Sequence, residues 1–152
     1  NTYDFDETIF NPDSSYAFIL YCWKHYPGKL LKTLPAVCLA SLHYFRDKSR
    51  AKELKEKLFA FLPSLTDVDA VVEDFWACHQ DGIGQWYLRQ KREDDIIISA
   101  SPEFLLSPIA RQLGVRLIAT PMDKHSGKIL GKNCHDTEKV RRSLSAFRKL
   151  MA

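Results

Sequence analysis

Two kinds of hydrophobic pattern divide the chain. Between residues 16 and 92, apolar and aromatic side chains recur every three or four positions, which is the spacing of an amphipathic helix. Pro27-Gly28 and Pro63-Ser64 interrupt this region with turn-forming residues, so the pattern predicts several helices. The predicted helical segments are 16–25, 30–45, 48–61, about 83–92, and one opened by a capping box at Thr66 and Asp69.

The pattern changes at residue 93. The stretch EDDIIISASPEF (93–104) holds three consecutive isoleucines between polar residues, which is typical of a strand buried on both faces of a parallel sheet. Ser101 and Pro102 then suit the N-cap and the first position of a helix. Gly114 is a natural end for that helix.

The rest of the chain completes an α/β pattern. VRLIAT (115–120) predicts a second buried strand, residues 122–133 predict a hairpin with a glycine-containing turn, and Asp136 caps a last predicted helix over 137–150. Residues 1–4 predict a very short first strand. This order predicts a Rossmann-like parallel sheet with a helical insertion of about 80 residues after its first strand.

The composition is that of one globular unit. The chain has 152 residues, of which 45% are hydrophobic and 27% are charged. The formal net charge of +3 is too small to indicate nucleic-acid binding. Acids also alternate with bases in KELKEK (52–57), as on a solvated helix face. We therefore expect no nucleic-acid partner.

The cysteines indicate a reducing environment. Cys22, Cys38, Cys78 and Cys134 form no CxxC pair, and the chain has no signal-peptide pattern. We therefore expect reduced thiols, no zinc site and a cytoplasmic protein. The longest apolar segment without charged residues, 33–45, has 13 residues, fewer than the roughly 20 that span a bilayer.

Polar residues gather where the predicted strands end. Asp4 and Asp6 follow the first strand, Ser99 ends the second, and Lys139 lies in the first turn of the last helix. Ligands of open parallel sheets bind beyond these carboxyl ends. Each residue alone has an ordinary explanation, and Lys139 has Glu138 beside it. Asp4 and Asp6 share one site only if the chain turns sharply after Asp4, or if one contributes its backbone carbonyl.

Taken together, these residues resemble a known family. YDFDET is similar to the DxDxT signature of the haloacid dehalogenase superfamily of phosphatases and phosphotransferases, and the serine of IIISAS and the lysine of DTEKVRR are similar to its second and third motifs. The helical insertion resembles the small cap of the phosphoserine-phosphatase-like branch, subfamily IB. The resemblance implies a core formed by residues 1–9 and 93–152 and a cap formed by residues 10–92.

The resemblance also implies a mechanism. Asp4 is the nucleophile and forms an aspartyl-phosphate, while Asp6 is the general acid that protonates the leaving alcohol and later the base that activates water. Mg²⁺ is held by the side chain of Asp4, the backbone carbonyl of Asp6 and an acid from a fourth motif. Thr8 orders the turn after Asp6.

The phosphate is expected beside the second and third motifs. Ser99 donates a hydrogen bond to a phosphoryl oxygen, and backbone N–H groups of Ala100 and Ser101 add others. Lys139 offsets the repulsion between the anionic phosphate and the anionic carboxylate.

The fourth motif has no counterpart in the sequence. No acid follows Glu138, and the last predicted helix extends to the end of the chain. We therefore expect a C-terminally incomplete core whose first strand is an exposed edge, with weak metal binding and slow turnover. A longer protein or another chain would supply the missing strand.

The insertion bears on the substrate. It is rich in aromatic residues, most of which we expect in a core. Segment 30–45 has an alternative, contact with a membrane surface or an acyl chain, because basic residues flank it. These residues are Lys29, Lys32, Arg46, Lys48 and Arg50. A phospho-amino acid and a phospholipid head group are both open as substrates, although the sequence holds no clear acid–arginine pair for serine beyond Arg50 and Glu53.

Two other functions stay open. A non-catalytic domain of the same fold would bind a phosphate ligand or a partner, and the missing metal ligand favours it. A phosphotransferase would use the same residues as a phosphatase. The oligomeric state does not follow from the sequence.

Overall fold

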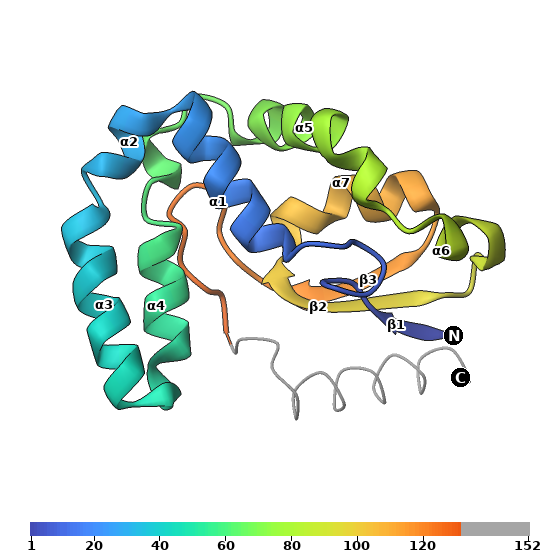
Figure 1. Ribbon diagram of the computed structural model, residues 1–152, viewed down its shortest axis with the longest axis horizontal. Helices are drawn as coiled ribbons and strands as arrows, with labels where there is room; N and C mark the ends of the chain where they lie inside the picture. The colour runs from blue at the N-terminus through green and yellow to red at the C-terminus, as the bar shows by residue number, and fades with distance from the viewer. Residues whose placement is uncertain (132–152) are drawn as a thin grey trace.

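The computed structural model describes residues 1–131, and these contain a parallel sheet (Figure 1). The strands are β1 (Thr2–Asp4), β2 (Ile96–Pro102) and β3 (Arg116–Thr120), in the spatial order β1-β2-β3. Asp4 of β1 pairs with Ile98 of β2, and Ile98 pairs with Ile118 of β3. The predicted α/β fold with a parallel sheet is therefore confirmed.

Most of the helices lie between β1 and β2 in the sequence. They are α1 (Ser14–His25), α2 (Pro27–Leu31), α3 (Leu34–Arg46), α4 (Ala51–Leu58), α5 (Val68–His79) and α6 (Gln85–Gln90), with short 3-10 turns η1 (Lys48–Arg50), η2 (Leu62–Ser64) and η3 (Gln80–Gly82). Helix α7 (Glu103–Leu113) joins β2 to β3. Figure 1 shows α1, α5 and α7 over one face of the sheet, with α3 and α4 as a pair beyond its end.

Strand β2 is buried on both faces, as its isoleucine run predicts. Ile97 belongs to the main core, whereas Ile96 and Ile98 pack with Ile118 on the opposite face. Successive side chains of a strand point to opposite faces, so three adjacent isoleucines supply apolar surface to both.

Aromatic side chains fill the core between the sheet and the helices. The fully buried ones are Phe5, Phe10, Phe18, Phe59, Phe61, Phe75 and Tyr87. The ring N–H of Trp76 donates to the carbonyl of Leu105 at 2.7 Å and so connects α5 to α7. Most aromatic residues of the insertion are buried or half-buried, in line with the expected core, but Tyr16, Phe45 and Trp86 are exposed.

Two helix starts differ from the prediction. The N-cap of α5 is Asp67, whose carboxylate accepts the N–H of Ala70 at 3.1 Å, so the capping box predicted at Thr66 and Asp69 is wrong. The N-cap of α7 is Pro102, the last residue of β2, one position after the predicted N-cap Ser101. Gly114 ends α7 in the left-handed conformation, with a φ of 70°, as predicted.

The predicted hairpin after β3 is present as a short bridge between Met122 and Ile129. Its turn contains Gly127, with a φ of 74°, where a Cβ atom would lie 2.4 Å from the carbonyl oxygen of Phe59. Neither the backbone conformation nor the space admits a side chain there. The predicted helix over 137–150 lies outside the described residues.

Three of the cysteines, Cys22, Cys38 and Cys78, are free thiols. Cys134 lies outside the described residues. Within residues 1–131, no three His, Cys, Asp or Glu side chains gather as a metal site. None of the helices in this range is long and apolar enough to cross a membrane.

Candidate active site

The site is built on the carboxyl ends of β1 and β2. Asp4 is the last residue of β1, pairs with Ile98 and is exposed. The next residue of β2 is Ser99, which is fully buried. The parallel register therefore places these two predicted site residues at the same edge of the sheet, where open α/β sheets bind ligands.

The loop after β1 turns sharply. The carbonyl of Phe5 accepts the N–H groups of Thr8, Ile9 and Phe10, the last two at 3.0 Å. Glu7 takes a left-handed conformation, with a φ of 58°. The turn that the Asp4–Asp6 spacing requires is thus present, although it follows Phe5. Thr8 takes part through its backbone N–H.

The residues before α6 hold this loop from the other side. The N–H of Gly84 donates to the carbonyl of Ile9 at 2.7 Å, and the N–H of Asn11 donates to the carbonyl of Gly82 at 3.1 Å. A Cβ atom on Gly82 would lie 2.4 Å from the ring of Phe10. The loop that carries Asp6 is therefore tied to the chain more than 70 residues further on.

Serine groups surround the carboxylate of Asp6. Its Oδ1 accepts the N–H of Ser14 at 2.8 Å and also the hydroxyl of Ser14. Its Oδ2 accepts the hydroxyls of Ser99 and Ser101, the latter at 3.1 Å. An ionised carboxylate has about four acceptor positions, so these donors occupy the full set.

The hydroxyls are also linked to one another. The oxygens of Ser14 and Ser15 each lie 2.8 Å from the hydroxyl oxygen of Ser101, and the N–H of Ser101 donates to the oxygen of Ser99 at 2.9 Å. Ser14, Ser99 and Ser101 are buried. Each hydroxyl carries one proton, so it cannot donate to all of these neighbours at once. The cluster can therefore redistribute its hydrogen bonds when a ligand arrives.

A lysine from the insertion reaches the same strand end. The ammonium of Lys55, on α4, donates to the carbonyl of Ala100 at 2.6 Å, and the hydroxyl of Thr120 donates to that carbonyl at 2.8 Å. Lys55 was not a predicted site residue, because KELKEK looks uniformly solvated. The run contains no signal that separates half-buried Lys55 from exposed Lys52 and Lys57.

The structure brings some of the predicted site residues together and leaves others apart. Asp6, Ser99 and Ser101 are in hydrogen-bond contact, and Ala100 lies between two of them. The N–H of Ser101, expected at a phosphate, is bonded to Ser99 in this structure. Lys139 lies outside the described residues. Arg50 and Glu53 pair with each other at 3.5 Å on the surface.

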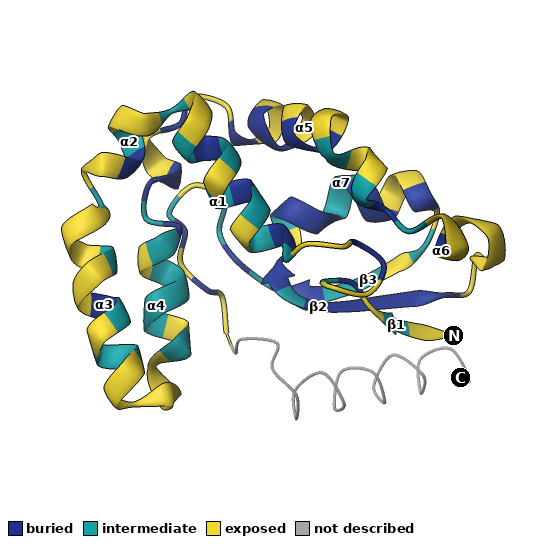
Figure 2. Cartoon of the chain, in the orientation of Figure 1, coloured by how far each residue is buried: buried dark blue, intermediate teal, exposed yellow. Residues whose placement is uncertain are grey.

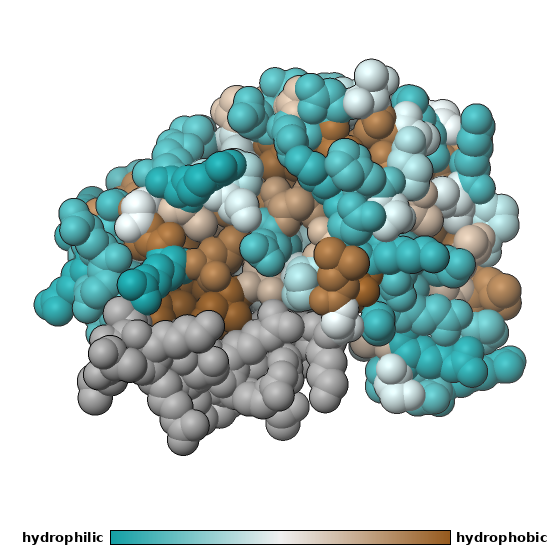
Figure 3. All heavy atoms as spheres, turned by 180° about the vertical axis from the view of Figure 1, so that it is seen from behind, coloured by the Kyte–Doolittle hydropathy of each residue, from teal (hydrophilic) through white to brown (hydrophobic). Residues whose placement is uncertain are grey.

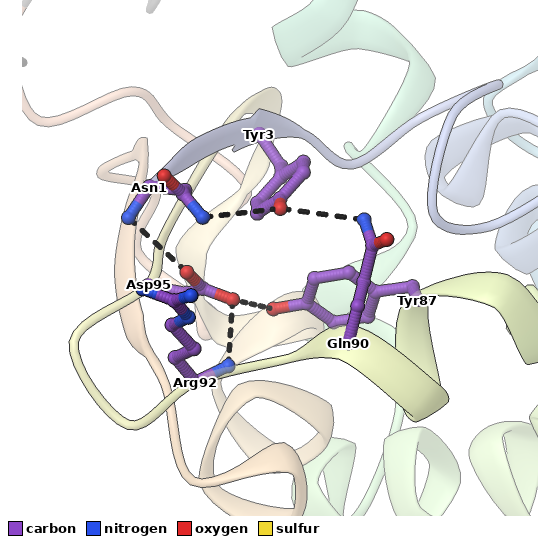
Figure 4. A network of polar contacts seen from close by, with 6 residues as sticks. All are labelled: Asn1, Tyr3, Tyr87, Gln90, Arg92 and Asp95. Carbon is purple, nitrogen blue, oxygen red and sulfur yellow. Dashed lines mark hydrogen bonds and ion pairs between the residues drawn. The ribbon is translucent and has the colours of Figure 1, made fainter.

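A second carboxylate is buried at the opposite end of β2 (Figure 4). Asp95 accepts the N–H of Arg92 at 2.9 Å and the hydroxyl of Tyr87 at 3.5 Å, and it lies 3.2 Å from the amino group of Asn1. Burial would raise the pKa of Asp95, but the hydrogen bonds from Arg92 and Asn1 outweigh it and lower the pKa. Burial and the charge of Asp95 raise the pKa of Tyr87 to about 12. This network joins structural elements at the amino end of the sheet, away from the candidate site.

The sequence matches the family of haloacid dehalogenase-like hydrolases over residues 2–150. The chain belongs to this family. The matched range includes every site residue that the sequence predicts, from Asp4 to Lys139.

This haloacid dehalogenase-like chain is also similar to a named protein and to a solved structure. Protein CicA from two strains of Caulobacter vibrioides is 31% identical over 163 aligned positions, which cover 95% of this chain and 71% of CicA. A crystal structure of a protein of unknown function from Bordetella pertussis Tohama I superimposes with a TM-score of 0.75 at 22% identity, over 98% of this chain and 74% of that one. The latter likeness concerns the fold.

Proposed function

We propose that the protein is a Mg²⁺-dependent phosphatase of the phosphoserine-phosphatase-like branch, which hydrolyses a phosphomonoester through an aspartyl-phosphate on Asp4. The observation that carries the proposal is the meeting of Asp6 with Ser99 and Ser101 beside the end of β1. This arrangement brings an acid, hydroxyl donors and the exposed carboxylate of Asp4 to one sheet edge. Family membership supports a hydrolase in general.

In the first step, a carboxylate oxygen of Asp4 attacks the phosphorus atom, and the bond to the leaving alcohol oxygen breaks. Asp6 gives that oxygen a proton. In the second step, Asp6 takes a proton from water, the water oxygen attacks the phosphorus, and Asp4 is released with inorganic phosphate. Asp6 must first lose one of its serine donors, because all of its acceptor positions are occupied.

Ser99 is the donor that we expect to move. Its hydroxyl donates to Asp6 in this structure, and turning it toward a phosphoryl oxygen would free one acceptor position on Oδ2 of Asp6, which Ser101 also contacts. Lys55 supplies a cation one residue away, at the carbonyl of Ala100. We propose that Lys55 and Lys139 together offset the phosphate charge.

The available ligands fit Mg²⁺, which prefers hard oxygen donors. We propose the carboxylate of Asp4 and the backbone carbonyl of Asp6 as ligands. Protein-bound Mg²⁺ usually keeps several waters and takes one or two carboxylates together with substrate phosphate, so these two groups suit it. A bound ion would supply positive charge that offsets the repulsion of the phosphate by Asp4.

We further propose that residues 10–92 act as a cap over a core formed by residues 1–9 and 93–152. Lys55 supports this division, because it extends from the insertion to the end of β2. A cap that contributes a cation to the site would exclude water and select the substrate. A phospho-amino acid and a phospholipid head group are the proposed substrate classes.

The test is hydrolysis of p-nitrophenyl phosphate with and without Mg²⁺. The 152-residue chain and the full translation product of its gene are assayed in parallel, each beside Asp4→Asn and, as a matched control, Glu7→Gln. Glu7 is an exposed acid of the same loop. Mg²⁺-dependent turnover that Asp4→Asn abolishes and Glu7→Gln retains supports the proposal. Absence of turnover in both proteins, or turnover that survives Asp4→Asn, overturns it.

A non-catalytic phosphate-binding domain is the second candidate. The absence of a three-residue metal cluster among residues 1–131 favours it. Asp6→Asn separates the two functions, since a phosphatase loses turnover and a binding domain keeps its affinity for inorganic phosphate. Product analysis separates a phosphatase, which releases inorganic phosphate, from a phosphotransferase, which forms a new phosphoester.

A further inference from the structure

Helix α3 exposes most of its apolar surface. Of its 13 residues, only Ala40 is buried. The exposed fractions are 56% for Leu39, 58% for Leu42 and 73% for Phe45. Figure 2 shows the helix as mostly exposed, in contrast to the buried segments of α1, α5 and α7. A single exposed leucine is ordinary, but several on one helix are not explained by packing within the described chain.

The exposed residues form a continuous stripe, which we call the α3 stripe. It consists of Leu31, Leu34, Cys38, Leu42 and Phe45, all of them exposed. Leu34, Cys38, Leu42 and Phe45 are spaced by three or four positions, so they line one side of α3, and Leu31 precedes them at the end of α2.

The side of α3 next to the stripe is used for packing. Val37, Ala40, Ser41 and Tyr44 are half-buried or buried there, and α3 packs on α4. In the view from behind, the side that α3 and α4 form is mostly hydrophilic, with an isolated hydrophobic group at its outer edge (Figure 3). The stripe therefore borders the packed side of the helix, and its residues remain exposed.

Positive charge surrounds the stripe. Residues 29–53 contain six basic residues and two acids, a net charge of +4, whereas the whole chain has +3. Lys32, Arg46, Lys48, Arg50 and Lys52 are exposed. The ammonium of Lys48 lies 4.3 Å from the ring centre of Tyr44 and 5.1 Å from that of Phe45, so charge and apolar surface are adjacent.

From this combination we infer that the α3 stripe is a docking surface for an anionic membrane, with α3 lying in the interface. An apolar stripe bordered by lysines and arginines is what a helix at a lipid surface requires: apolar residues enter the acyl boundary while the cations meet anionic head groups. Helix α3 is about 20 Å long, shorter than the roughly 30 Å hydrocarbon layer, so it rests on the membrane.

Charge argues against a second copy of this chain as the occupant. Two identical faces, each with a net charge of +4 around its stripe, would repel one another across a two-fold interface. An anionic surface is attracted by the same charges. The inference does not depend on the proposed phosphatase reaction, and its test needs no activity.

The test is co-sedimentation of the purified protein with vesicles of phosphatidylcholine alone or mixed with phosphatidylserine. We expect binding to the anionic vesicles that decreases with added salt. Leu42→Ser combined with Phe45→Ser should weaken it about tenfold or more. Lys32→Glu combined with Lys52→Glu should abolish the preference for anionic lipid. Leu130→Ser, which changes a 61% exposed leucine outside the stripe, is the matched control and should bind like the wild type.

Three results would overturn the inference: no binding to anionic vesicles, equal binding by the Leu42/Phe45 variant, or equal weakening by Leu130→Ser. Light scattering after size exclusion tests whether a second copy of the chain occupies the stripe instead. A dimer that becomes a monomer in the Leu42/Phe45 variant, without vesicle binding by the wild type, would assign the stripe to a second copy. The variants change exposed residues, and circular dichroism verifies that they fold.

Discussion

Ser99 donates its hydroxyl hydrogen bond to Asp6, although the two residues lie 93 positions apart in the sequence. Strand pairing explains the contact, because the N–H of Phe5 donates to the carbonyl of Ile98 at 3.2 Å and so continues the β1–β2 ladder toward the loop. A ligand that accepts the hydrogen bond of Ser99 therefore removes that hydrogen bond from Asp6. Phosphate binding and the freeing of the proposed acid are thereby coupled in one side chain.

Ser99→Ala should reduce catalysis more than Ser101→Ala. The first change removes a donor from Asp6 and from the proposed phosphate site, and we expect kcat/KM to fall about 10- to 100-fold. Ser101 is bonded to the same oxygen at 3.1 Å, but it is not the family's phosphate serine by resemblance. Both variants are compared by p-nitrophenyl phosphate hydrolysis, with thermal unfolding as the folding control. Equal losses would contradict the special role of Ser99.

Lys55→Met should weaken substrate binding. The change keeps most of the length of the side chain but removes the cation beside Ala100, so we expect KM for a phosphomonoester to rise about tenfold, with a smaller effect on kcat. Lys55→Arg, which keeps the positive charge, should raise KM less than Lys55→Met does. The matched control is Lys52→Met, which changes an exposed lysine of the same helix. An unchanged KM in Lys55→Met would show that this lysine only supports the fold.

The parts of the fold that depend on local sequence were predictable. The isoleucine run of β2 and the left-handed Gly114 each follow from neighbouring residues. The start of α7 was not predictable in the same way. Serine is a common N-cap residue, but the hydroxyl of Ser101 is bonded to Asp6, which is 95 positions away. A distant contact thus outweighs a local preference.

The candidate site shows the same limit. Asp6 and Ser99 come from recognisable motifs, so the sequence predicts that they meet. Lys55 comes from a run of alternating charges, and only the packing of α4 against the end of β2 distinguishes it from its neighbours. Likewise, Phe45 looks like a core residue in the sequence but is 73% exposed. Tertiary orientation, which periodicity does not contain, decides both cases.

Cys22 should resist thiol reagents in the folded protein, whereas Cys38 and Cys78 should react. Burial raises the pKa of the Cys22 thiol to about 12, so almost no reactive thiolate is present at neutral pH, while the other two are exposed. Alkylation followed by peptide mass spectrometry measures each position separately. Labelling of Cys22 should rise to the level of Cys38 only in denaturant. Equal labelling of the two in the native protein would contradict the packing of α1.

Tyr87 should make the protein sensitive to alkali. Its pKa is about 12 in the folded state against an ordinary value of 10.0, so the folded state holds the phenol proton more tightly than the unfolded state does. The resulting contribution to stability is complete below pH 10 and is lost as the pH rises from 10 through about 12. In this window the unfolded chain releases the proton and the folded chain keeps it.

Tyr87→Phe tests this relationship, because phenylalanine fills nearly the same space without a titrating group. The free energy of unfolding, measured by urea denaturation at several pH values, should fall less steeply between pH 10 and 12 in Tyr87→Phe than in the wild type. The control Tyr16→Phe changes a tyrosine that is 63% exposed, and its slope should match that of the wild type. If Tyr87→Phe kept the wild-type slope, the buried contact between Tyr87 and Asp95 would not be the source of the alkaline sensitivity.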